Sequence, residues 1–269
     1  MDCFIESNDY AYIRLSGIAD MNDPEFQGHS HMYHELYIPI EGKTRFIIEG
    51  CDFNLNPYDI LIIPPYKLHR ALPKENTYFD RIVIRIYPSM YKGMYCDEII
   101  NLFEEQSNIN RKIPGHIAKR SEIPQILDYI QTHSVDDNPY VKSAIRSKIT
   151  ELLYKLNSNY RFEILSDPGG ITQKVIDYID HNLSNTLTQQ SLSEHFGYSV
   201  RQMNTIFKKD TGITVGKYID LKKMQTAIDL HSKGRSLIHS SIEAGFNSYE
   251  SFAYLYKKEY GTSPKKSLS

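Results

Sequence analysis

The stretch "GYSVRQMNTIFKKDTG", residues 197–212, decides the fold of the C-terminal part of this 269-residue chain. Gly197 suits the left-handed turn that follows a helix, and residues 189–196 before it have a helical pattern. Ser199 is placed to cap the next helix, with Gln202 at the reciprocal capping-box position. Apolar residues then recur on one side of that helix, at Met203, Ile206 and Phe207. The spacing predicts two short helices joined by a tight turn, a helix-turn-helix.

A second copy, "GFNSYESFAYLYKKEYG", occupies residues 245–261. We expect a helix over residues 238–244, a turn at Gly245, and a cap at Asn247 with Glu250 three residues later. The buried side of its second helix is then Phe252, Leu255 and Tyr256. Residues 216–232 between the copies predict one helix roughly 25 Å long. Such a connector could hold two reading helices about one duplex turn, ~34 Å, apart.

The outward side chains of the first copy suit nucleic acid. Glutamine and asparagine pair with adenine edges, arginine pairs with guanine, and serine contacts several bases. Lysine pairs at 208–209, 222–223, 257–258 and 265–266 suit phosphates. The alternative is an ordinary helical bundle whose polar residues are solvated. Two matched copies favour DNA binding, with Arg201, Gln202, Asn204, Thr205 and Lys208 facing out of the first.

Charge and composition limit the classes of protein to which the chain can belong. Residues 170–269 hold 13 Lys and Arg against 9 Asp and Glu, while residues 1–169 hold 18 against 24. A basic C-terminal part predicts that one end meets a polyanion. No apolar run reaches the ~18 residues of a membrane span, so we expect no membrane partner. No secretory signal is visible, and three cysteines in no metal-like spacing suit a reducing cytosol.

The N-terminal part reads as strands up to about residue 90 and as helices after it. Alternation is clear in 44–50 and 60–63. Ser121 could cap a helix with Ile123, Ile126, Leu127 and Ile130 on one side. Asn138-Pro139 then predicts the start of another helix. Its apolar stripe is Ile145, Ile149, Leu152, Leu153 and Leu156, and residues 166–170 read as a linker.

A histidine-rich stretch, "HSHMYHELYIPIEG", occupies residues 29–42. As a strand it places ligand-binding side chains on one face and mostly core residues on the other. The ligand-binding face holds His29, His31, Tyr33, Glu35 and Tyr37, and His69 follows a proline turn downstream. Arg45 could pair with an acidic effector, although a solvated arginine is as good an interpretation.

Residues Ile171 to Pro264 resemble the DNA-binding domain of the AraC/XylS family of bacterial transcription regulators. The matching features are "LSEHFGYS" with "FKKDTG", then "SIEAGFNS" with "YKKEYGTSP". The resemblance implies two helix-turn-helix units that enter successive major-groove segments. The DNA-binding residues it implies, with the caps and lysine pairs, are Ser199, Arg201, Gln202, Asn204, Thr205, Lys208, Lys209, Asn247, Ser248, Tyr249, Glu250, Ser251, Tyr254, Lys257 and Lys258.

Residues 20–90 resemble the cupin barrel, which carries His-x-His, three residues, Glu, and a later histidine. Three interpretations stay open for this set. In a metallocupin enzyme, His29, His31, Glu35 and His69 would hold Fe, Mn or Zn. In a sensor, the interior binds a small molecule, and in the third case the residues form a polar core. We favour the sensor and expect no catalytic residue, cofactor or metal. The effector-binding candidates are His29, His31, Tyr33, Glu35, Tyr37, Arg45 and His69.

The expected fold is a multidomain α+β chain. It has a cupin-like effector-sensing barrel at 1–95, a helical linker and dimerisation region at 96–165, and an all-α double helix-turn-helix domain at 166–269. The predicted function is a cytoplasmic transcription regulator, and activation is the commoner mode in the family. Its expected partners are promoter DNA, a small effector, RNA polymerase and a second copy bound through residues 138–158, although that stripe could instead cover the barrel. The alternatives are a metal-dependent cupin enzyme and a ligand-independent DNA-binding regulator.

Overall fold

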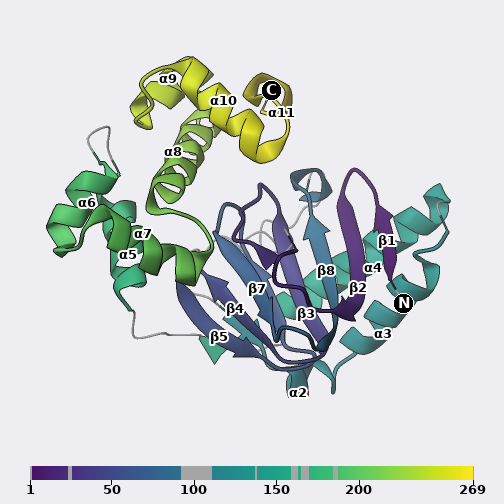
Figure 1. Cartoon of the computed structure of the whole chain (residues 1–269). Coiled ribbons are helices and arrows are strands. Elements are labelled where there is room, and N and C mark those ends of the chain that lie inside the picture. Colours follow the sequence, from purple (N-terminus) through teal and green to yellow (C-terminus); the bar gives the residue numbers. More distant parts are fainter. Residues whose placement is uncertain are drawn as a thin grey trace. The chain divides into compact units, whose positions relative to one another are not determined.

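The computed structural model describes residues 2–23, 26–91, 111–136, 138–158, 163–164, 170–183 and 187–268. Contacts divide the chain into two compact units, Met1–Asp167 and Pro168–Ser269. The first unit is rich in strands and the second is helical (Figure 1). The predicted order, a strand-rich N-terminal domain before an all-α domain with two helix-turn-helix motifs, is therefore confirmed. None of the described helices is long and apolar enough to cross a membrane.

Two antiparallel sheets form the N-terminal barrel (Figure 1). The larger sheet has the order β1-β2-β8-β3-β6-β9-β10, and the smaller has the order β5-β4-β7. The strands of the larger sheet are β1 (Cys3–Glu6), β2 (Tyr10–Ile18), β3 (His34–Glu41), β6 (Ile60–Ile63), β8 (Tyr78–Ile86), β9 (Arg111–Ile113) and β10 (Glu163–Ile164). The strands of the smaller sheet are β4 (Thr44–Ile48), β5 (Cys51–Leu55) and β7 (His69–Pro73).

The central strands β3 and β8 are largely buried on both faces, and the period of two along each strand decides which residue serves which core. Tyr37 and Val83 point into the barrel, where Phe46 from the smaller sheet meets them. Their neighbours Leu36 and Ile84 point the other way, into a second core. Strands β3 and β8 therefore contribute side chains both to the barrel interior and to the core on the outer face of the sheet.

Helices cover that outer face. They are α2 (Gly115–Ala118), α3 (Ile123–His133) and α4 (Pro139–Ser158), with the 3₁₀ helix η2 (Pro88–Tyr91) after β8. The second core takes Ile123, Ile126, Leu127 and Ile130 from α3. It also takes the α4 stripe, Ile145, Ile149, Leu152, Leu153 and Leu156, each fully buried within the one chain. The stripe is thus occupied by the sheet, so the prediction that it pairs with its twin in a dimer is wrong.

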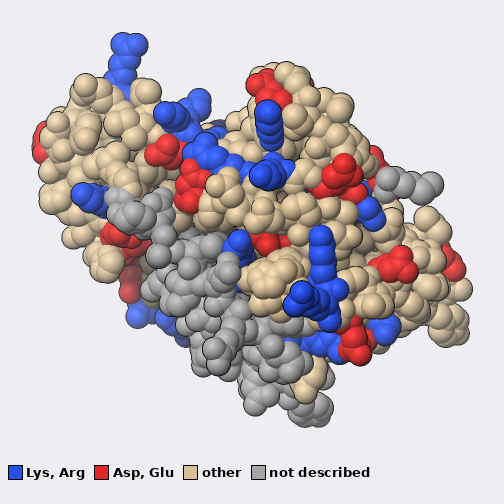
Figure 2. Space-filling view, turned by 90° about the horizontal axis from the view of Figure 1, so that it is seen from below, with Lys and Arg blue, Asp and Glu red and all other residues tan. Residues whose placement is uncertain are grey.

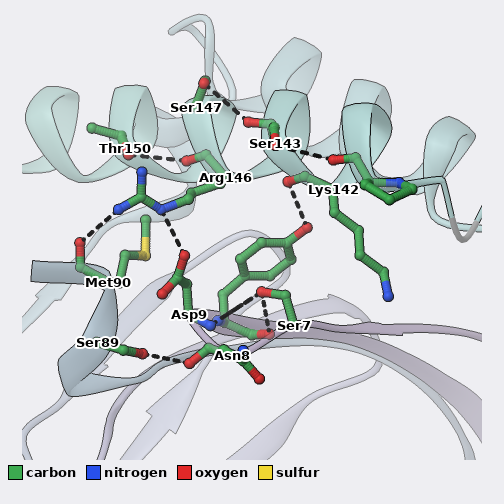
Figure 3. Close-up of polar contacts among 12 residues, drawn as sticks. Ser7, Asn8, Asp9, Ser89, Met90, Lys142, Ser143, Arg146, Ser147 and Thr150 are labelled. Carbon is green, nitrogen blue, oxygen red and sulfur yellow. Dashed lines mark hydrogen bonds and ion pairs between the residues drawn. The ribbon is translucent and has the colours of Figure 1, made fainter.

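Polar contacts also hold α4 to the strand ends (Figure 3). The Arg146 guanidinium pairs with Asp9 at 2.9 Å and donates to the Met90 carbonyl at 3.2 Å. The Tyr10 hydroxyl donates to the Lys142 carbonyl at 3.0 Å. Helix α4 begins as predicted, because Asn138 accepts from the Tyr140 amide. For α3 the cap position is Glu122 instead, and Ser121 accepts from the Ile123 amide.

The helices of the second unit are α5 (Ile171–Asn182), α6 (Gln189–Phe196), α7 (Val200–Thr211), α8 (Val215–Ser232), α9 (Leu237–Glu243), α10 (Tyr249–Tyr260) and α11 (Pro264–Ser267). Helices α7 and α10 both pack on α8. Tyr218 of α8 lies 5.5 Å from the Phe207 ring of α7, and Lys223 of α8 donates to the Gly245 carbonyl. At 1.5 Å per residue, the 18 residues of α8 extend about 27 Å.

Candidate nucleic-acid interface and barrel pocket

The first helix-turn-helix has the predicted geometry. Gly197 ends α6 in the left-handed conformation, with φ of 71°. Ser199 then caps α7, its hydroxyl accepting from the Gln202 amide while the Gln202 side chain accepts from the Ser199 amide. Met203 and Phe207 are buried on the inner side of α7. The turn and the cap together fix the direction in which α7 leaves α6.

The second helix-turn-helix repeats this geometry one residue later than predicted. Gly245 has φ of 98° and occupies the turn between α9 and α10. The cap is Ser248, which forms a capping box with Ser251, whereas Asn247 and Glu250 are both exposed outside it. The prediction of an Asn247–Glu250 cap is therefore wrong. A serine pair outcompetes it because both short hydroxyls reach the backbone amides.

The predicted DNA-binding residues divide into exposed side chains and side chains that the fold uses. Those exposed are Arg201, Thr205, Lys208, Lys209, Asn247, Glu250, Tyr254, Lys257 and Lys258. Those in capping boxes are Ser199, Gln202, Ser248 and Ser251. Tyr249 is half-buried, with its ring under the Lys265 ammonium. Exposed cations in the last turns of α7 and α10 also suit the negative ends of those helices.

Asn204 lies half-buried inside the first unit. Its amide nitrogen donates to the Gln189 side chain at 2.6 Å, and its oxygen accepts from the Val215 amide at 3.0 Å. A side chain at Gly216 would meet Gln189 at 2.5 Å, so the glycine permits this close approach of α6 and α8. Both polar ends of Asn204 thus fasten α7 between its neighbours, which corrects the prediction that Asn204 faces out to read a base.

The barrel holds a cavity that brings several predicted effector residues together. Its empty volume is about 350 Å³ with its open mouth included. Its lining comprises His29, Glu35, Tyr37, Phe46, His69, Ala71, Arg81, Val83 and Arg85. His31 joins the cluster, because its Nε2 lies 3.3 Å from Glu35, and the Tyr33 ring stacks on His31 at 3.9 Å.

Two expectations about this region need correction. The strand β3 begins only at His34, and His29 reaches His69 through an isolated bridge rather than as part of a strand. Arg45 is exposed on β4 and pairs with Asp52, so it faces away from the cavity. Sequence reasoning also missed Arg81 and Arg85. Their signal was present in "DRIVIRIY", where arginines four residues apart share one face of an otherwise apolar strand.

Three imidazoles share one orientation in the cluster. The Nδ1 atoms of His29, His31 and His69 lie 2.7–2.9 Å from the backbone carbonyls of Gln27, Tyr33 and Lys67. A carbonyl can only accept, so each Nδ1 carries the proton, and in the neutral ring Nε2 has a free lone pair. One nitrogen from each ring lies within 4.8 Å of the others. The three rings therefore turn their Nε2 atoms toward one another and toward Glu35.

Burial determines most of the charge states here. It lowers the pKa of His29 and holds the pKa of His69 well below the usual value. Burial raises the pKa of the Glu35 carboxyl, but its hydrogen bond with His31 and the nearby imidazoles outweigh this and lower it to about 2. Glu35 and the His31 Nε2 would repel each other if both carried only lone pairs, so a proton or a metal ion belongs between them. Three imidazoles and a carboxylate fit a divalent transition metal.

Charged side chains of both signs are interspersed over the face drawn in Figure 2, as expected for a chain of net charge −2. Two helix-turn-helix units joined by a long helix define the class of helix-turn-helix DNA-binding regulators.

Comparisons with known proteins agree with this class. A family model described as a helix-turn-helix domain matches residues 192–268. The HTH-type transcriptional activator RhaS of Mannheimia succiniciproducens is 22% identical over 250 residues, which cover 89% of this chain and 88% of RhaS. The XylDLEGF operon transcriptional activator 1 of Pseudomonas putida is 25% identical over 244 residues, 84% of this chain and 67% of that one. Over most of its length the chain is thus similar to transcription activators, and residues 192–268 carry the helix-turn-helix domain.

Solved structures include a remote likeness. The crystal structure of unsaturated fatty acid bound ToxT from Vibrio cholerae matches 97% of this chain and 95% of ToxT, at 10% identity and a TM-score of 0.41.

Proposed function

We propose that this protein is a sequence-specific DNA-binding transcription activator controlled by a small molecule that binds in the barrel. The observation that carries the DNA-binding part is the pair of matched helix-turn-helix units on α8. Each presents an exposed outer face on its second helix, with Arg201 and Thr205 on α7 and Glu250 and Tyr254 on α10. Helices of this size fit the major groove, and α8 is long enough to space them by about one turn of duplex.

Activation is proposed from the relatives, because RhaS and the XylDLEGF operon protein are both named as activators. A regulator of bacterial DNA acts in the cytoplasm, where RNA polymerase is the partner of an activator. The two helix-turn-helix units favour this function over a metal-dependent enzyme.

Effector control is proposed from the barrel cavity. Strand β8 supplies alternate residues to the cavity and to the core beneath α3 and α4. The end of β8 leads into η2, whose Met90 carbonyl accepts from Arg146 of α4 (Figure 3). A ligand that moves β8 would therefore act on α4, and binding would shift the population between forms with different DNA affinity.

Dimerisation through residues 138–158 remains a proposal for the outer face of α4. Tyr140 and Tyr154 are 85% and 61% exposed there, and Ser143 and Ser147 lie between them on the same face. Analytical ultracentrifugation of Tyr140→Glu with Tyr154→Glu tests it. If this variant still forms a dimer as the wild type does, the outer face of α4 is not the dimer interface.

The decisive experiment measures binding to DNA. Fluorescence anisotropy with a labelled duplex from the chain's own upstream region should show affinity that falls steeply with salt, because phosphate contacts release counterions. A duplex of scrambled sequence is the control. Equal affinity for the two duplexes at every salt concentration would exclude sequence-specific binding.

A further inference from the structure

The two helix-turn-helix units present side chains of opposite charge at the same position. Helices α7 and α10 are 12 residues long, and each is capped by a serine and followed by a left-handed glycine, so their positions correspond one to one. The second residue of α7 is Arg201, and the second residue of α10 is Glu250. Residues at this end of a recognition helix are the ones that contact base edges. The two units therefore meet their base pairs with opposite charges.

Glu250 is not used by the fold of the second unit. Ser248 and Ser251 form the capping box of α10, which leaves Glu250 outside it, and the Glu250 side chain is exposed. Within the part of the chain that the structure describes, the Glu250 carboxylate takes part in no hydrogen bond or ion pair. Its charge is thus available to whatever the outer face of α10 meets.

Arg201 is equally available in the first unit. It is exposed, and its guanidinium makes no hydrogen bond or ion pair with the described residues. A cation in the first turn opposes the helix dipole, so α7 gains no stability from Arg201. Arginine donates to both O6 and N7 of guanine, which is the commonest specific contact in the major groove. The first unit is therefore suited to a base that accepts hydrogen bonds.

The outer face of α10 around Glu250 is otherwise uncharged. Glu250 is the only charged residue in 249–256, and one turn after it the face carries Tyr254, which is 68% exposed. The lysines of α10, Lys257 and Lys258, lie in its last turn. DNA phosphates repel a carboxylate that enters the groove. This repulsion is offset only where the carboxylate meets a hydrogen-bond donor.

The major groove offers few such donors. They are N4 of cytosine and N6 of adenine, whereas O6 and N7 of guanine and O4 of thymine are acceptors that repel a carboxylate. Adenine N6 lies beside the acceptor N7, so adenine suits an amide side chain, which both donates and accepts. Cytosine presents its N4 donor with no acceptor on the same base edge. Cytosine is therefore the base that suits Glu250 best.

We propose that Glu250 specifies a cytosine in the DNA segment bound by the second unit, by accepting a hydrogen bond from the N4 amine. The matched Arg201 specifies a guanine in the segment bound by the first unit. Since α8 spaces the units by about one duplex turn, the two base pairs lie about ten base pairs apart. This inference rests on the proposed function, in which both units bind DNA.

Binding to defined duplexes tests it. Selection from a randomised duplex library with the full-length chain supplies the specific sequence. Fluorescence anisotropy then compares wild type, Glu250→Gln and Glu250→Arg on that duplex, on a scrambled duplex and on duplexes with every other base pair at each position. Glu250→Gln keeps the shape and removes the charge, and Glu250→Arg reverses the charge. The matched control is Asp177→Asn, because Asp177 is an exposed carboxylate on α5, outside both helix-turn-helix units, and thermal melting checks the fold of each variant.

At one position the wild type should prefer cytosine over guanine and thymine by about ten-fold, the value of one specific base contact. Glu250→Gln should lose this preference or turn it to adenine at that position alone. It should also bind the scrambled duplex more tightly than the wild type does, because a charge that repels phosphates is gone. Glu250→Arg should turn the preference to guanine, and Asp177→Asn should keep the wild-type preference at every position.

Unchanged base preferences in either folded Glu250 variant would overturn the proposal. If Glu250→Gln also melts at a lower temperature, Glu250 serves only the helix dipole of α10. A changed preference at a position where the wild type prefers adenine would overturn the assignment of cytosine. A library that yields no duplex preferred over the scrambled one refutes the proposed function itself, whereas a selected duplex with unchanged preferences in the Glu250 variants refutes this inference alone.

Discussion

Asn204 donates from its amide to the Gln189 side chain at 2.6 Å, and this contact joins α7 to α6. The Asn204 oxygen accepts from the Val215 amide at the start of α8, so three helices meet at one side chain. The asparagine is a structural fastener at the centre of the first helix-turn-helix.

Replacing Asn204 should therefore affect folding before it affects base readout. Asn204→Ala removes two hydrogen bonds and leaves the Val215 amide without its partner, a loss of about 1–3 kcal/mol. We expect the free energy of unfolding of the helical unit to fall by this amount in urea denaturation. If Asn204→Ala leaves the free energy of unfolding unchanged and lowers only the affinity for the specific duplex, Asn204 contacts a base after all.

Arg201 should show the opposite behaviour, because it is exposed on α7. Arg201→Ala should lower the affinity for a specific duplex by about 1–3 kcal/mol, the value of one arginine–guanine pair, and leave the melting temperature unchanged. Lys174→Ala is the control, since it removes an exposed cation from α5, outside both helix-turn-helix units. Equal losses in the two variants would mean that Arg201 contributes only charge.

The histidine cluster predicts a response to metal. Zn²⁺ added to metal-free protein should raise the melting temperature, because binding to the folded state alone stabilises it. His69→Gln should abolish most of the shift, since His69 offers a buried Nε2 to the cluster. The exposed His116→Gln is the control. A shift that is the same in His69→Gln and the wild type would place the zinc elsewhere.

Acid should destabilise the barrel. Burial lowers the pKa of His34 from 6.5 to about 3, so the folded state binds fewer protons than the unfolded state between these values. The contribution of His34 is therefore complete above about pH 6.5 and is lost as the pH falls toward 3, at up to ~1.4 kcal/mol per pH unit. Urea unfolding at pH 7.5, 5.5 and 4.5 measures this, and His34→Leu should flatten the dependence. An equally steep dependence in His34→Leu would assign the effect to other groups.

Gly115 should tolerate no side chain. A Cβ there would lie 2.4 Å from the Pro57 carbonyl oxygen and 2.9 Å from the Asp59 amide. The Gly115 amide donates to Asp59 at 2.7 Å, and Lys112 pairs with the same carboxylate at 2.9 Å, so the backbone cannot move away easily. Gly115→Ala should reduce the free energy of unfolding by about 1–3 kcal/mol. Gly17→Ala, where a Cβ would only touch the Phe79 ring at 3.9 Å, should change it little.

Local signals in the sequence predicted the helical unit closely. Gly197 and Ser199 are specified by turn and cap chemistry, which acts over a few residues, and the structure has both. The cap at Ser248 shows the limit of such signals, because Asn247 and Ser248 are both good caps and only the path of the chain into α10 decides between them. The internal role of Asn204 depends on Gln189 and Val215, which are distant in the sequence, and no local pattern shows it.

Contacts between distant strands were harder to predict. The resemblance to the cupin motif predicted that four side chains lie close together, namely those of His29, His31, Glu35 and His69. Arg81 lines the same cavity only because β8 pairs with β3, which no local pattern shows. The α4 stripe illustrates a different ambiguity. An apolar helical face requires a partner, and the sequence alone does not distinguish a sheet of the same chain from a second copy.

The burial of the α4 stripe against the sheet has a consequence for how such genes recombine. A crossover between codons 95 and 96 would separate the sheet from the helices that cover it. The chimeric proteins would then expose apolar surface from this shared core and would be prone to aggregation. A crossover near codons 167 and 168 cuts neither compact unit, so chimeras that pair this barrel with a foreign reader of DNA should be viable when they are joined there.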